Sequence, residues 1–529
     1  MPEILASQKD NGEFGTEPWI STDQNVLLPL AAAWSLKDSA HYRSQAVLRA
    51  IEAGGLALQQ AQDGDGMFTF RKKDHSTWGQ IYMPWVYSRW IRTFALVKEA
   101  MGDEARARWS EALLLGYDGI ARTALDRVHN IPTHHAMGLY CAGLVFERPD
   151  WREQARDFMA GVVAAQSPDG WWAEHKGPVV AYNLVYAESL GVYYSQSGDA
   201  TVLEALERAA AYHAACVYPD GSLLETVDGR NAYHEGVRLG NVGLSQTPEG
   251  RGFLQQQHAL HLRAGGDCEA DYAAHMLLYG ADGERVDPAS GQDAHTSRIG
   301  DDGLVVRRRP WFYALSAFTT EIPQNRWGQD RQNFLSVYHD AVGLVLGGGN
   351  TKLQPLWSNF TVGDTALLAH TPGEEEPDFS PRPGLAHVPQ DAALDGEALK
   401  LDYGVARCRI EVEARDENEL HVLLTVEEAT DGPVAGHITL IARLGQALTS
   451  DQGVCEQLGD EEVRWENPAW IEHAGWRLEL PAGGQLRWPV LPHNPYRKDG
   501  TATVEEARLV FSVPLEGGTG RRIVLRVSG

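Results

Sequence analysis

The chain has 529 residues, of which 43% are hydrophobic and 22% are charged, a composition typical of a folded protein with two or three domains. The net charge of −26 argues against a general nucleic-acid-binding protein and against a protein of anionic membrane surfaces. No run of about 18 apolar residues occurs, so no membrane-spanning helix is predicted.

The first 24 residues are polar, and we expect them to form an irregular N-terminal arm. They contain no apolar core of the kind that a secretion signal needs. A full-length chain is therefore expected in the cytoplasm. If the chain has been trimmed, the periplasm or the cell exterior is the expected location.

Residues 25–281 carry apolar residues at helical spacing almost throughout, which predicts a helical domain. The predicted helices cover residues 26–36, 41–62, 78–101, 104–126, 134–146, 151–166, 178–197, 199–217 and 267–279. Similar turns recur between alternate helices, at residues 62–68, 166–172 and 218–223. The last two are 51 residues apart, about one helical hairpin. Repeated helix pairs of this kind predict an incomplete (α/α) toroid.

Residues 282–303 are polar and rich in glycine and aspartate, which predicts a linker. Beyond them the hydrophobic period changes from 3.6 to 2, in short runs separated by Gly, Pro and Asp. Residues 304–529 are therefore predicted to form an antiparallel β-sandwich. The fold class expected for the whole chain is a helical toroid followed by a β-sandwich.

Polar and ionisable residues crowd the helix starts and turns between residues 127 and 231. A purely structural helical array does not need so many imidazoles, amides and phenols, so this region is the predicted functional site. Its polar members are His129, Asn130, His134, His135, Glu174, His175, Tyr182, Asn183, Asp228, Arg230 and Asn231.

The segment from Asn130 to Tyr182 resembles the heparinase II/III-type polysaccharide lyases and the related oligoalginate lyases. The resemblance rests on an Asn/His-bearing helix start, a Gly-Leu-Tyr-x-Ala-Gly helix that ends in Phe, and a Gln-x-x-Asp-Gly turn followed by Glu and later by Tyr. The resemblance implies the same two-domain fold that the periodicity predicts. It also implies cleavage of a uronate-containing glycan by β-elimination.

The resemblance implies a role for each matched residue. Asn130 and either His134 or His135 would neutralise the uronate carboxylate, and Tyr182 would be the acid/base, assisted by Tyr186. Many relatives supply a further histidine from the sandwich; residues 328–336 contain none, and His339 is the candidate to replace it. The substrate-binding residues that we expect are Trp171, Glu174, Tyr186, Arg230, Tyr233, His234 and His339.

Structural roles compete with these functional ones. Asn130 is also a natural helix cap, and Tyr182 and Tyr186 are spaced as a buried helix stripe. His134 and His135 point about 100° apart on a helix, so both cannot face one cleft. The alternative role for Arg230 is an ion pair with Asp228.

Two other functions remain open. A toroidal glycoside hydrolase would use two carboxylates from among Glu174, Glu225 and Asp228. A non-catalytic glycan-binding protein would use the same cleft without chemistry. The expected partner is an anionic polysaccharide or oligosaccharide, with no nucleic acid and no membrane. We expect no cofactor, because no metal-ligand motif occurs, although a structural divalent cation and the oligomeric state stay open.

Overall fold

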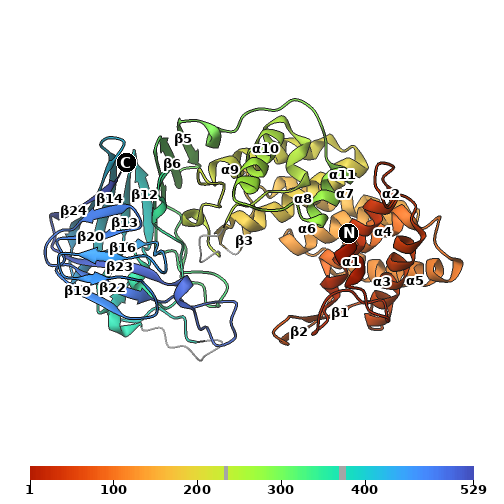
Figure 1. The fold of residues 1–529 in the computed structure, drawn as a ribbon, viewed down its shortest axis with the longest axis horizontal. Helices are drawn as coiled ribbons and strands as arrows, with labels where there is room; N and C mark the ends of the chain where they lie inside the picture. Colours follow the sequence, from red (N-terminus) through yellow and green to blue (C-terminus); the bar gives the residue numbers. More distant parts are fainter. Residues whose placement is uncertain (175, 231–235, 369–376, 529) are drawn as a thin grey trace. The chain divides into compact units, whose positions relative to one another are not determined.

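The computed structural model describes residues 1–174, 176–230, 236–368 and 377–528 (Figure 1). The chain divides into two compact units, each built from segments that are distant in sequence. Unit 1 comprises Met1–Trp172, Tyr182–Ala211 and Leu239–Val286. Unit 2 comprises Ala173–Ala181, Tyr212–Arg238 and Asp287–Gly529. Two segments of the predicted toroid, 173–181 and 212–238, therefore belong with the sandwich.

The helices account for most of the N-terminal half of the chain. They are α1 (Pro2–Ala6), α2 (Leu27–Ser35), α3 (Gln45–Ala61), α4 (Pro84–Val97), α5 (Asp103–Thr123), α6 (Asn130–Val145), α7 (Pro149–Ala164), α8 (Val180–Ser197), α9 (Leu203–Ala215), α10 (Pro248–Arg263) and α11 (Ala270–Tyr279). Helix α1 lies in the arm that was predicted to be irregular, and α10 was not predicted. Within the described residues, no helix has both the length and the apolar character needed to cross a membrane.

Helices α4 and α6 form the inside of unit 1. Both bury residues on every side, and α4 packs against α2 and α6. Helices α5 and α7 instead bury a single face, and α6 also packs against α7. A helix that is buried all round belongs to a core, whereas an amphipathic helix covers it. This alternation of inner and outer helices is that of an (α/α) toroid.

Three turns between helices repeat the same backbone pattern. In each turn a glycine in the left-handed region closes the loop, with φ of +82° at Gly66, +90° at Gly170 and +87° at Gly221. The glycine N–H donates to the carbonyl oxygen three residues earlier, over 3.0, 2.9 and 2.9 Å. Only glycine adopts this conformation without a steric penalty. The predicted internal repeat is thus present in the backbone.

A short hairpin precedes α4, where a helix was predicted from residue 78. Strands β1 (Phe68–Arg71) and β2 (Thr77–Ile81) pair antiparallel. Helix α4 starts only at Pro84, the first helical position, where proline is favoured. The apolar residues before Pro84 belong to the hairpin, which Figure 1 shows extending from the helices of unit 1.

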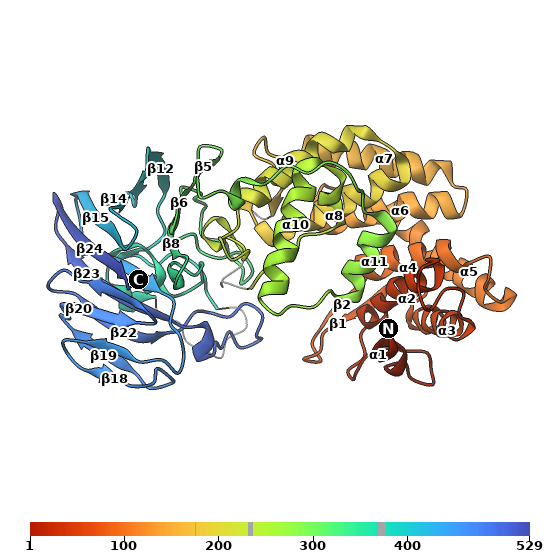
Figure 2. The same cartoon turned by 45° about the horizontal axis from the view of Figure 1, so that its top comes forward.

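Unit 2 contains two large antiparallel sheets, whose strands Figures 1 and 2 show in adjacent layers. One sheet holds β5 (Ala294–Ile299), β6 (Gly303–Arg308), β7 (Trp311–Ser316), β8 (Leu335–His339), β9 (Gly343–Leu346), β10 (Phe360–Gly363), β11 (Leu385–Ala386), β16 (Val434–Leu440), β19 (Val463–Glu466), β22 (Gln485–Val490) and β23 (Arg508–Leu515). The other holds β12 (Asp391–Asp395), β13 (Ala398–Asp402), β14 (Ala406–Ala414), β15 (Glu419–Ala429), β17 (Leu448–Ser450), β18 (Val454–Cys455), β20 (Trp470–His473), β21 (Trp476–Glu479) and β24 (Thr519–Val527). Strand β5 lies within the predicted linker, 282–303.

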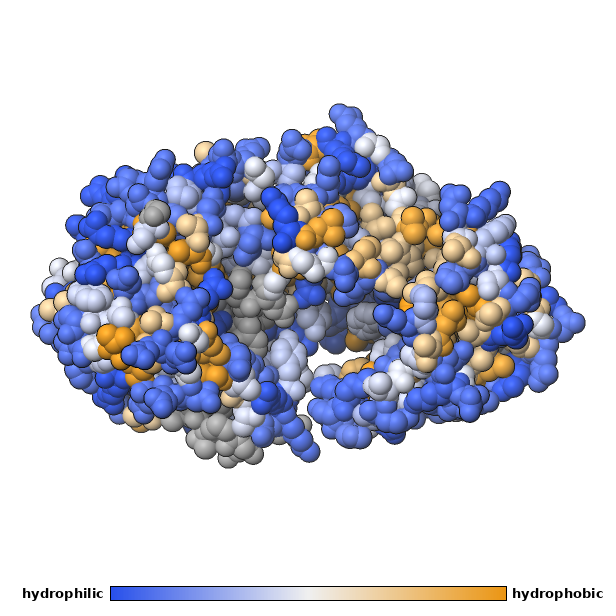
Figure 3. Space-filling model, viewed as in Figure 1, coloured by the Kyte–Doolittle hydropathy of each residue, from blue (hydrophilic) through white to orange (hydrophobic). Residues whose placement is uncertain are grey.

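The sandwich core lies between the two sheets. Strand β15 alternates buried and half-exposed residues from Leu420 to Val426, the pattern of a strand with one face in a core. Leu424 and Phe511, from different sheets, are both fully buried in one cluster. The face shown in Figure 3 is mostly hydrophilic, with hydrophobic patches over both units.

Candidate functional site

The predicted site residues divide between the two units. Unit 1 holds Asn130, His134, His135, Trp171, Tyr182 and Tyr186. Unit 2 holds Glu174, Arg230 and His339. Tyr233 and His234 lie outside the described residues. We therefore describe the two groups separately.

His134 joins three helices of unit 1. Its Nε2 lies 2.8 Å from the hydroxyl of Ser88 in α4, and its Nδ1 lies 3.3 Å from the hydroxyl of Ser189 in α8. The indole of Trp85 stacks on the imidazole at 5.5 Å, with 19° between the ring planes. His134 is the fifth residue of α6 and Ser88 the fifth of α4, so the N-terminal ends of these helices lie at the same level.

Asn130 and Tyr182 lie in the first turns of α6 and α8, the two helices that the contact between His134 and Ser189 links. Asn130 is the first residue of α6 and is buried, while Tyr182 is the third residue of α8 and is half-buried. His134 lies one turn after Asn130, and Ser189 lies two turns after Tyr182. The His134–Ser189 contact thus holds together the two helices whose first turns carry the predicted amide and phenol.

Both predicted histidines are buried and neutral. Burial lowers the pKa of His134 to about 3 and that of His135 to about 4, against an ordinary value of 6.5. His134 is 1% exposed and His135 is 3% exposed. An imidazole that stays neutral and packed at pH 7 connects helices well, whereas proton transfer requires a pKa nearer the working pH.

A buried ionic cluster lies next to His134 and was not predicted. The guanidinium of Arg89 donates to both carboxylate oxygens of Asp271, over 2.9 and 2.6 Å. The imidazole of His275 lies 3.4 Å from the carboxylate of Glu188. Burial alone would raise the pKa of Glu188, but His275 and then Arg89 outweigh it and hold that pKa well below its usual value. These charges join α4, α8 and α11.

The two aromatic residues after the Asp169-Gly170 turn have different environments. Trp172 is buried, donates from its indole to the carbonyl oxygen of Val162 over 2.8 Å, and stacks on Tyr186 at 5.0 Å. Trp171 is half-exposed. Tyr186 is 1% exposed, so its ring belongs to the core of unit 1. Among these aromatic groups, Trp171 and Tyr182 remain the ones with accessible surface.

In unit 2, a short segment brings Glu174 and Arg230 together. Glu174, in β3 (Ala173–Glu174), lies 3.7 Å from the guanidinium of Arg230 and is buried, while the Arg230 side chain is 14% exposed. The same guanidinium lies 5.5 Å from the ring centre of Trp327. The carboxylate of Asp228 instead accepts the backbone N–H groups of Val180 and Arg230, each over 2.8 Å. The alternative ion pair between the Arg230 and Asp228 side chains is not the contact observed.

Arg331 fixes this segment to the sandwich. Its guanidinium donates to the carbonyl oxygens of Val227 and Pro178, over 3.0 and 3.2 Å. Burial lowers its pKa to about 10. The N–H of Gln329 donates to the carbonyl oxygen of Gly229 over 2.9 Å. Residues 227–230 are thus held by the loop before β8. From the sequence alone, this loop was notable only because residues 328–336 contain no histidine.

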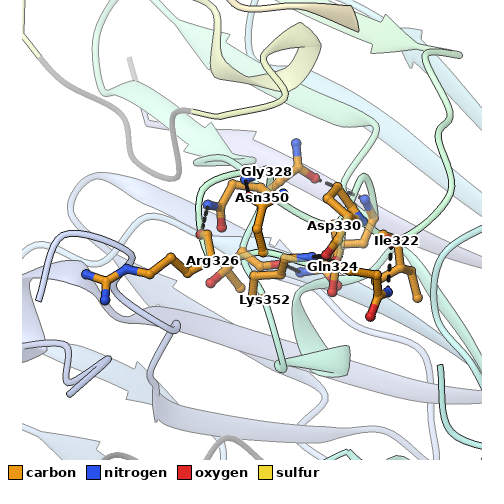
Figure 4. A network of polar contacts seen from close by, with 12 residues as sticks. Ile322, Gln324, Arg326, Gly328, Asp330, Asn350 and Lys352 are labelled. Carbon is orange, nitrogen blue, oxygen red and sulfur yellow. Dashed lines mark hydrogen bonds and ion pairs between the residues drawn. The ribbon is translucent and has the colours of Figure 1, made fainter. Parts of the chain in front are cut away.

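A buried charged network supports that loop, as Figure 4 shows. The ammonium of Lys352 donates to the carboxylate of Asp330 over 2.7 Å and to the carbonyl oxygen of Pro323 over 2.5 Å. The imidazole of His387 lies 3.3 Å from the same carboxylate. All three ionisable side chains are buried. Burial would raise the pKa of Asp330, but Lys352 outweighs it and lowers that pKa.

His339 and Glu225 have local partners. The ring of His339 packs edge-on against Trp311 at 4.5 Å, and its Nε2 lies 3.1 Å from the carbonyl oxygen of Glu417. Glu225 accepts the hydroxyl of Tyr218 and the N–H of Gly348, each over 2.9 Å. The contacts of His339 are thus not shared with those of Arg230. No group of three or more metal-ligating side chains occurs among the described residues.

No family model and no curated protein sequence matches the chain. Solved structures do match over nearly its whole length. A heparinase III has a TM-score of 0.58 and 12% identity, covering 99% of this chain and 80% of that one. A chondroitinase AC lyase has a TM-score of 0.53 and 11% identity, covering 99% and 79%. A xanthan lyase from Paenibacillus has a TM-score of 0.58 and 13% identity, covering 100% and 56%, so this chain spans little more than half of it.

At such identities the likeness shows the fold. It confirms the predicted fold class, an N-terminal toroid followed by an antiparallel sandwich, and matches the fold implied by the resemblance to heparinase-type lyases. The roles assigned to individual residues stay predictions.

Proposed function

We propose that this protein is a polysaccharide lyase that cleaves a uronic-acid-containing glycan by β-elimination. The observation that carries the proposal is the placement of Asn130 and Tyr182 in the first turns of two helices joined through His134. This placement occurs in a fold shared with three solved polysaccharide lyases. An amide can neutralise the carboxylate and a phenol can transfer the protons in such an elimination.

The reaction removes a proton from C5 of the uronate and breaks the bond between C4 and the glycosidic oxygen. The electrons of the C5–H bond form the C4–C5 double bond, and the departing oxygen takes up a proton. An ionised carboxylate opposes negative charge at C5, so an amide donor is needed to stabilise the enolate-like intermediate. Asn130 supplies that donor, and the N-terminus of α6 adds partial positive charge. Tyr182 transfers the protons.

Arg230 is proposed to bind a carboxylate of the glycan. Its guanidinium is partly exposed and is held between Glu174 and Trp327, which fix its orientation. An oriented guanidinium suits a planar carboxylate because it can donate two parallel hydrogen bonds. The proposed chemistry needs only charge neutralisation and proton transfer, so we propose that it uses no cofactor.

The hydrolase alternative is less well supported because its carboxylates have structural roles. Asp228 accepts two backbone N–H groups, and Glu225 accepts a hydroxyl and a backbone N–H. Glu174 faces Arg230. A hydrolase needs one carboxyl group that is protonated and a second that acts on water or the sugar. In the structure these three carboxylates instead bind groups of the protein itself.

The decisive experiment follows ultraviolet absorbance on chondroitin sulfate, heparan sulfate, xanthan and alginate, because elimination creates a double bond conjugated to a carboxylate. Tyr182→Phe is expected to lower kcat by about a hundredfold or more on whichever glycan is cleaved. Tyr186→Phe is the matched control. It removes the same atom one helical turn away, from a ring that is stacked in the core on Trp172.

Tyr186→Phe should keep most of the activity. Near-normal turnover in folded Tyr182→Phe, or a greater loss in Tyr186→Phe, would show that Tyr182 is not the proton carrier. New reducing ends without ultraviolet absorbance would identify a hydrolase.

A further inference from the structure

The hairpin of β1 and β2 in unit 1 exposes an aromatic side chain, that of Trp78. Trp78 is 57% exposed, the most exposed aromatic side chain in the part of the chain that the structure describes. Strand β2 is exposed along nearly its whole length. An isolated two-stranded sheet is marginally stable in water, and an exposed indole adds nothing to its burial. Much of the Trp78 side chain is therefore accessible to a ligand.

The base of the hairpin is firmly anchored. Phe68 is buried and packs against Tyr87 at 5.5 Å. The ammonium of Lys73, in the turn, lies 2.6 Å from the carboxylate of Asp23 and 2.9 Å from the carbonyl oxygen of Thr16. Anchors in β1 and in the turn thus hold the hairpin in a fixed orientation.

A β-bulge directs Trp78. Phe70 pairs with Gly79 and Arg71 pairs with Thr77, so Trp78 is the extra residue between two pairs. Its ring lies 5.0 Å from that of Phe70, tilted by 53°. Gly79 adopts φ of +111°, and a side chain at that position would meet no atom within 4 Å. A bulge commonly re-aims a side chain, and here the indole of Trp78 lies beside the ring of Phe70.

Two cationic side chains lie near this aromatic pair. The ammonium of Lys72 lies 4.3 Å from the centre of the Trp78 ring, and Arg71 is exposed on the neighbouring strand. The whole chain carries a net charge of −26, so a local group of cations on an exposed loop stands out. An apolar ring face beside positive charge matches a sugar chain whose pyranose rings carry C–H faces and whose substituents are anionic.

We propose that Trp78, with Phe70 and Lys72, forms a binding site for one pyranose ring of an anionic glycan, separate from the residues proposed to react. Trp78 and Phe70 would stack on the apolar face of the ring, and Lys72 would bind a carboxylate or sulfate of the chain. The inference rests on the proposed function, because it takes the substrate to be an anionic polysaccharide.

The test measures binding without relying on catalysis. The full-length protein is run through native gels that contain increasing concentrations of chondroitin sulfate, heparan sulfate, xanthan or alginate, and the apparent Kd is taken from the retardation. Trp78→Ala is expected to raise the Kd of the retained polymer about five- to tenfold, the scale of one aromatic contact. Trp78→Tyr should restore most of the affinity, because it keeps an aromatic face.

Tyr42→Ala is the matched control, because Tyr42 is also an exposed aromatic of unit 1, at 41%, and has the guanidinium of Arg43 at 5.6 Å from its ring. It should leave the Kd unchanged. Lys72→Gln should weaken binding at low salt and have less effect at high salt. On a glycan that is cleaved, Trp78→Ala should raise KM and leave kcat within about twofold.

The outcomes separate the hairpin from the proposed function. If the wild type binds and cleaves a polymer and Trp78→Ala binds it equally well, the hairpin inference is wrong and the lyase proposal stands. If the wild type binds a polymer through Trp78 but yields no unsaturated product, the hairpin inference holds and the lyase proposal fails. Retention of the wild type by none of the four polymers would overturn the hairpin inference.

Discussion

His134 illustrates how a residue in a functional motif can act through structure. The resemblance to lyases gives either His134 or His135 a role at the substrate carboxylate. In the structure, His134 contacts Ser88, Ser189 and Trp85 and is 1% exposed. These contacts with two neighbouring helices, α4 and α8, are consistent with a structural role. It is best understood as a residue that positions α6 and α8.

We therefore predict a stability effect for His134. His134→Ala should lower the free energy of unfolding by about 2–4 kcal/mol, through lost hydrogen bonds and a cavity. Urea denaturation followed by circular dichroism measures the change. His258→Ala, at a half-buried position on α10, is the control and should cost about 1 kcal/mol or less.

A readout of activity distinguishes the positioning role from a catalytic one. If His134 only positions the helices, His134→Ala should lower kcat without changing the shape of its pH profile. Loss of one limb of the pH profile, with the free energy of unfolding unchanged, would show that His134 takes part in proton transfer.

At the scale of elements, the loop before β8 shows how the sandwich holds a segment of distant sequence. Arg331 donates to carbonyl oxygens of Val227 and Pro178, and the adjacent Asp330 is tied to Lys352. Because Asp330 and Lys352 are both buried, each charge depends on the other. The pair therefore fixes the loop, and the loop fixes the segment that carries Arg230.

Breaking that pair is predicted to be costly. Asp330→Asn leaves the Lys352 ammonium buried without its counter-ion and should lower the free energy of unfolding by about 3–5 kcal/mol. The double variant Asp330→Asn/Lys352→Met should recover part of the loss. Asp395→Asn removes one member of an exposed pair with Lys400 and is the control, expected to leave the urea midpoint nearly unchanged. Equal urea midpoints for Asp330→Asn and Asp395→Asn would contradict the argument.

At the scale of the whole molecule, buried neutral histidines set the pH dependence of stability. Burial lowers the pKa of His134, His213 and His437 to about 3 and that of His135 to about 4. In the unfolded chain these imidazoles have a pKa near 6.5 and take up protons as the pH falls. The unfolded state then binds more protons, so stability decreases as the pH falls below about 6.5.

The urea midpoint should therefore decrease when the pH is lowered from 7.5 to 5. At pH 5 each such histidine should lower the free energy of unfolding by about 2 kcal/mol. His437 lies in the sandwich and His134 in the helical unit, so each unit should show the effect. A midpoint that stays level or rises toward pH 5 would mean that these imidazoles are not held neutral.

Local sequence determined much of the fold. Hydrophobic periods of 3.6 and of 2 identified most helices and the strand-rich half. An element with one buried face carries apolar residues at its own period, so the sequence shows it directly. Glycines in the repeated turns identified the toroid, because positive φ at Gly170 and Gly221 requires that residue type. The hairpin was missed because its two strands are short and their bulge interrupts the alternation. Helix α10 was missed because it exposes much of its surface and has few apolar residues.

Tertiary structure decided how the candidate site is assembled. Val180 donates to Asp228, 48 residues away, and Arg331 reaches Val227, 104 residues away. Such pairings depend on where whole elements pack, and no local pattern records them. The sequence by itself determined the polar residues at the helix starts and the change from helix to strand. Burial and long-range hydrogen bonds decided which of those residues connect helices and which keep accessible surface, because a side chain's neighbours are fixed only when the chain has folded.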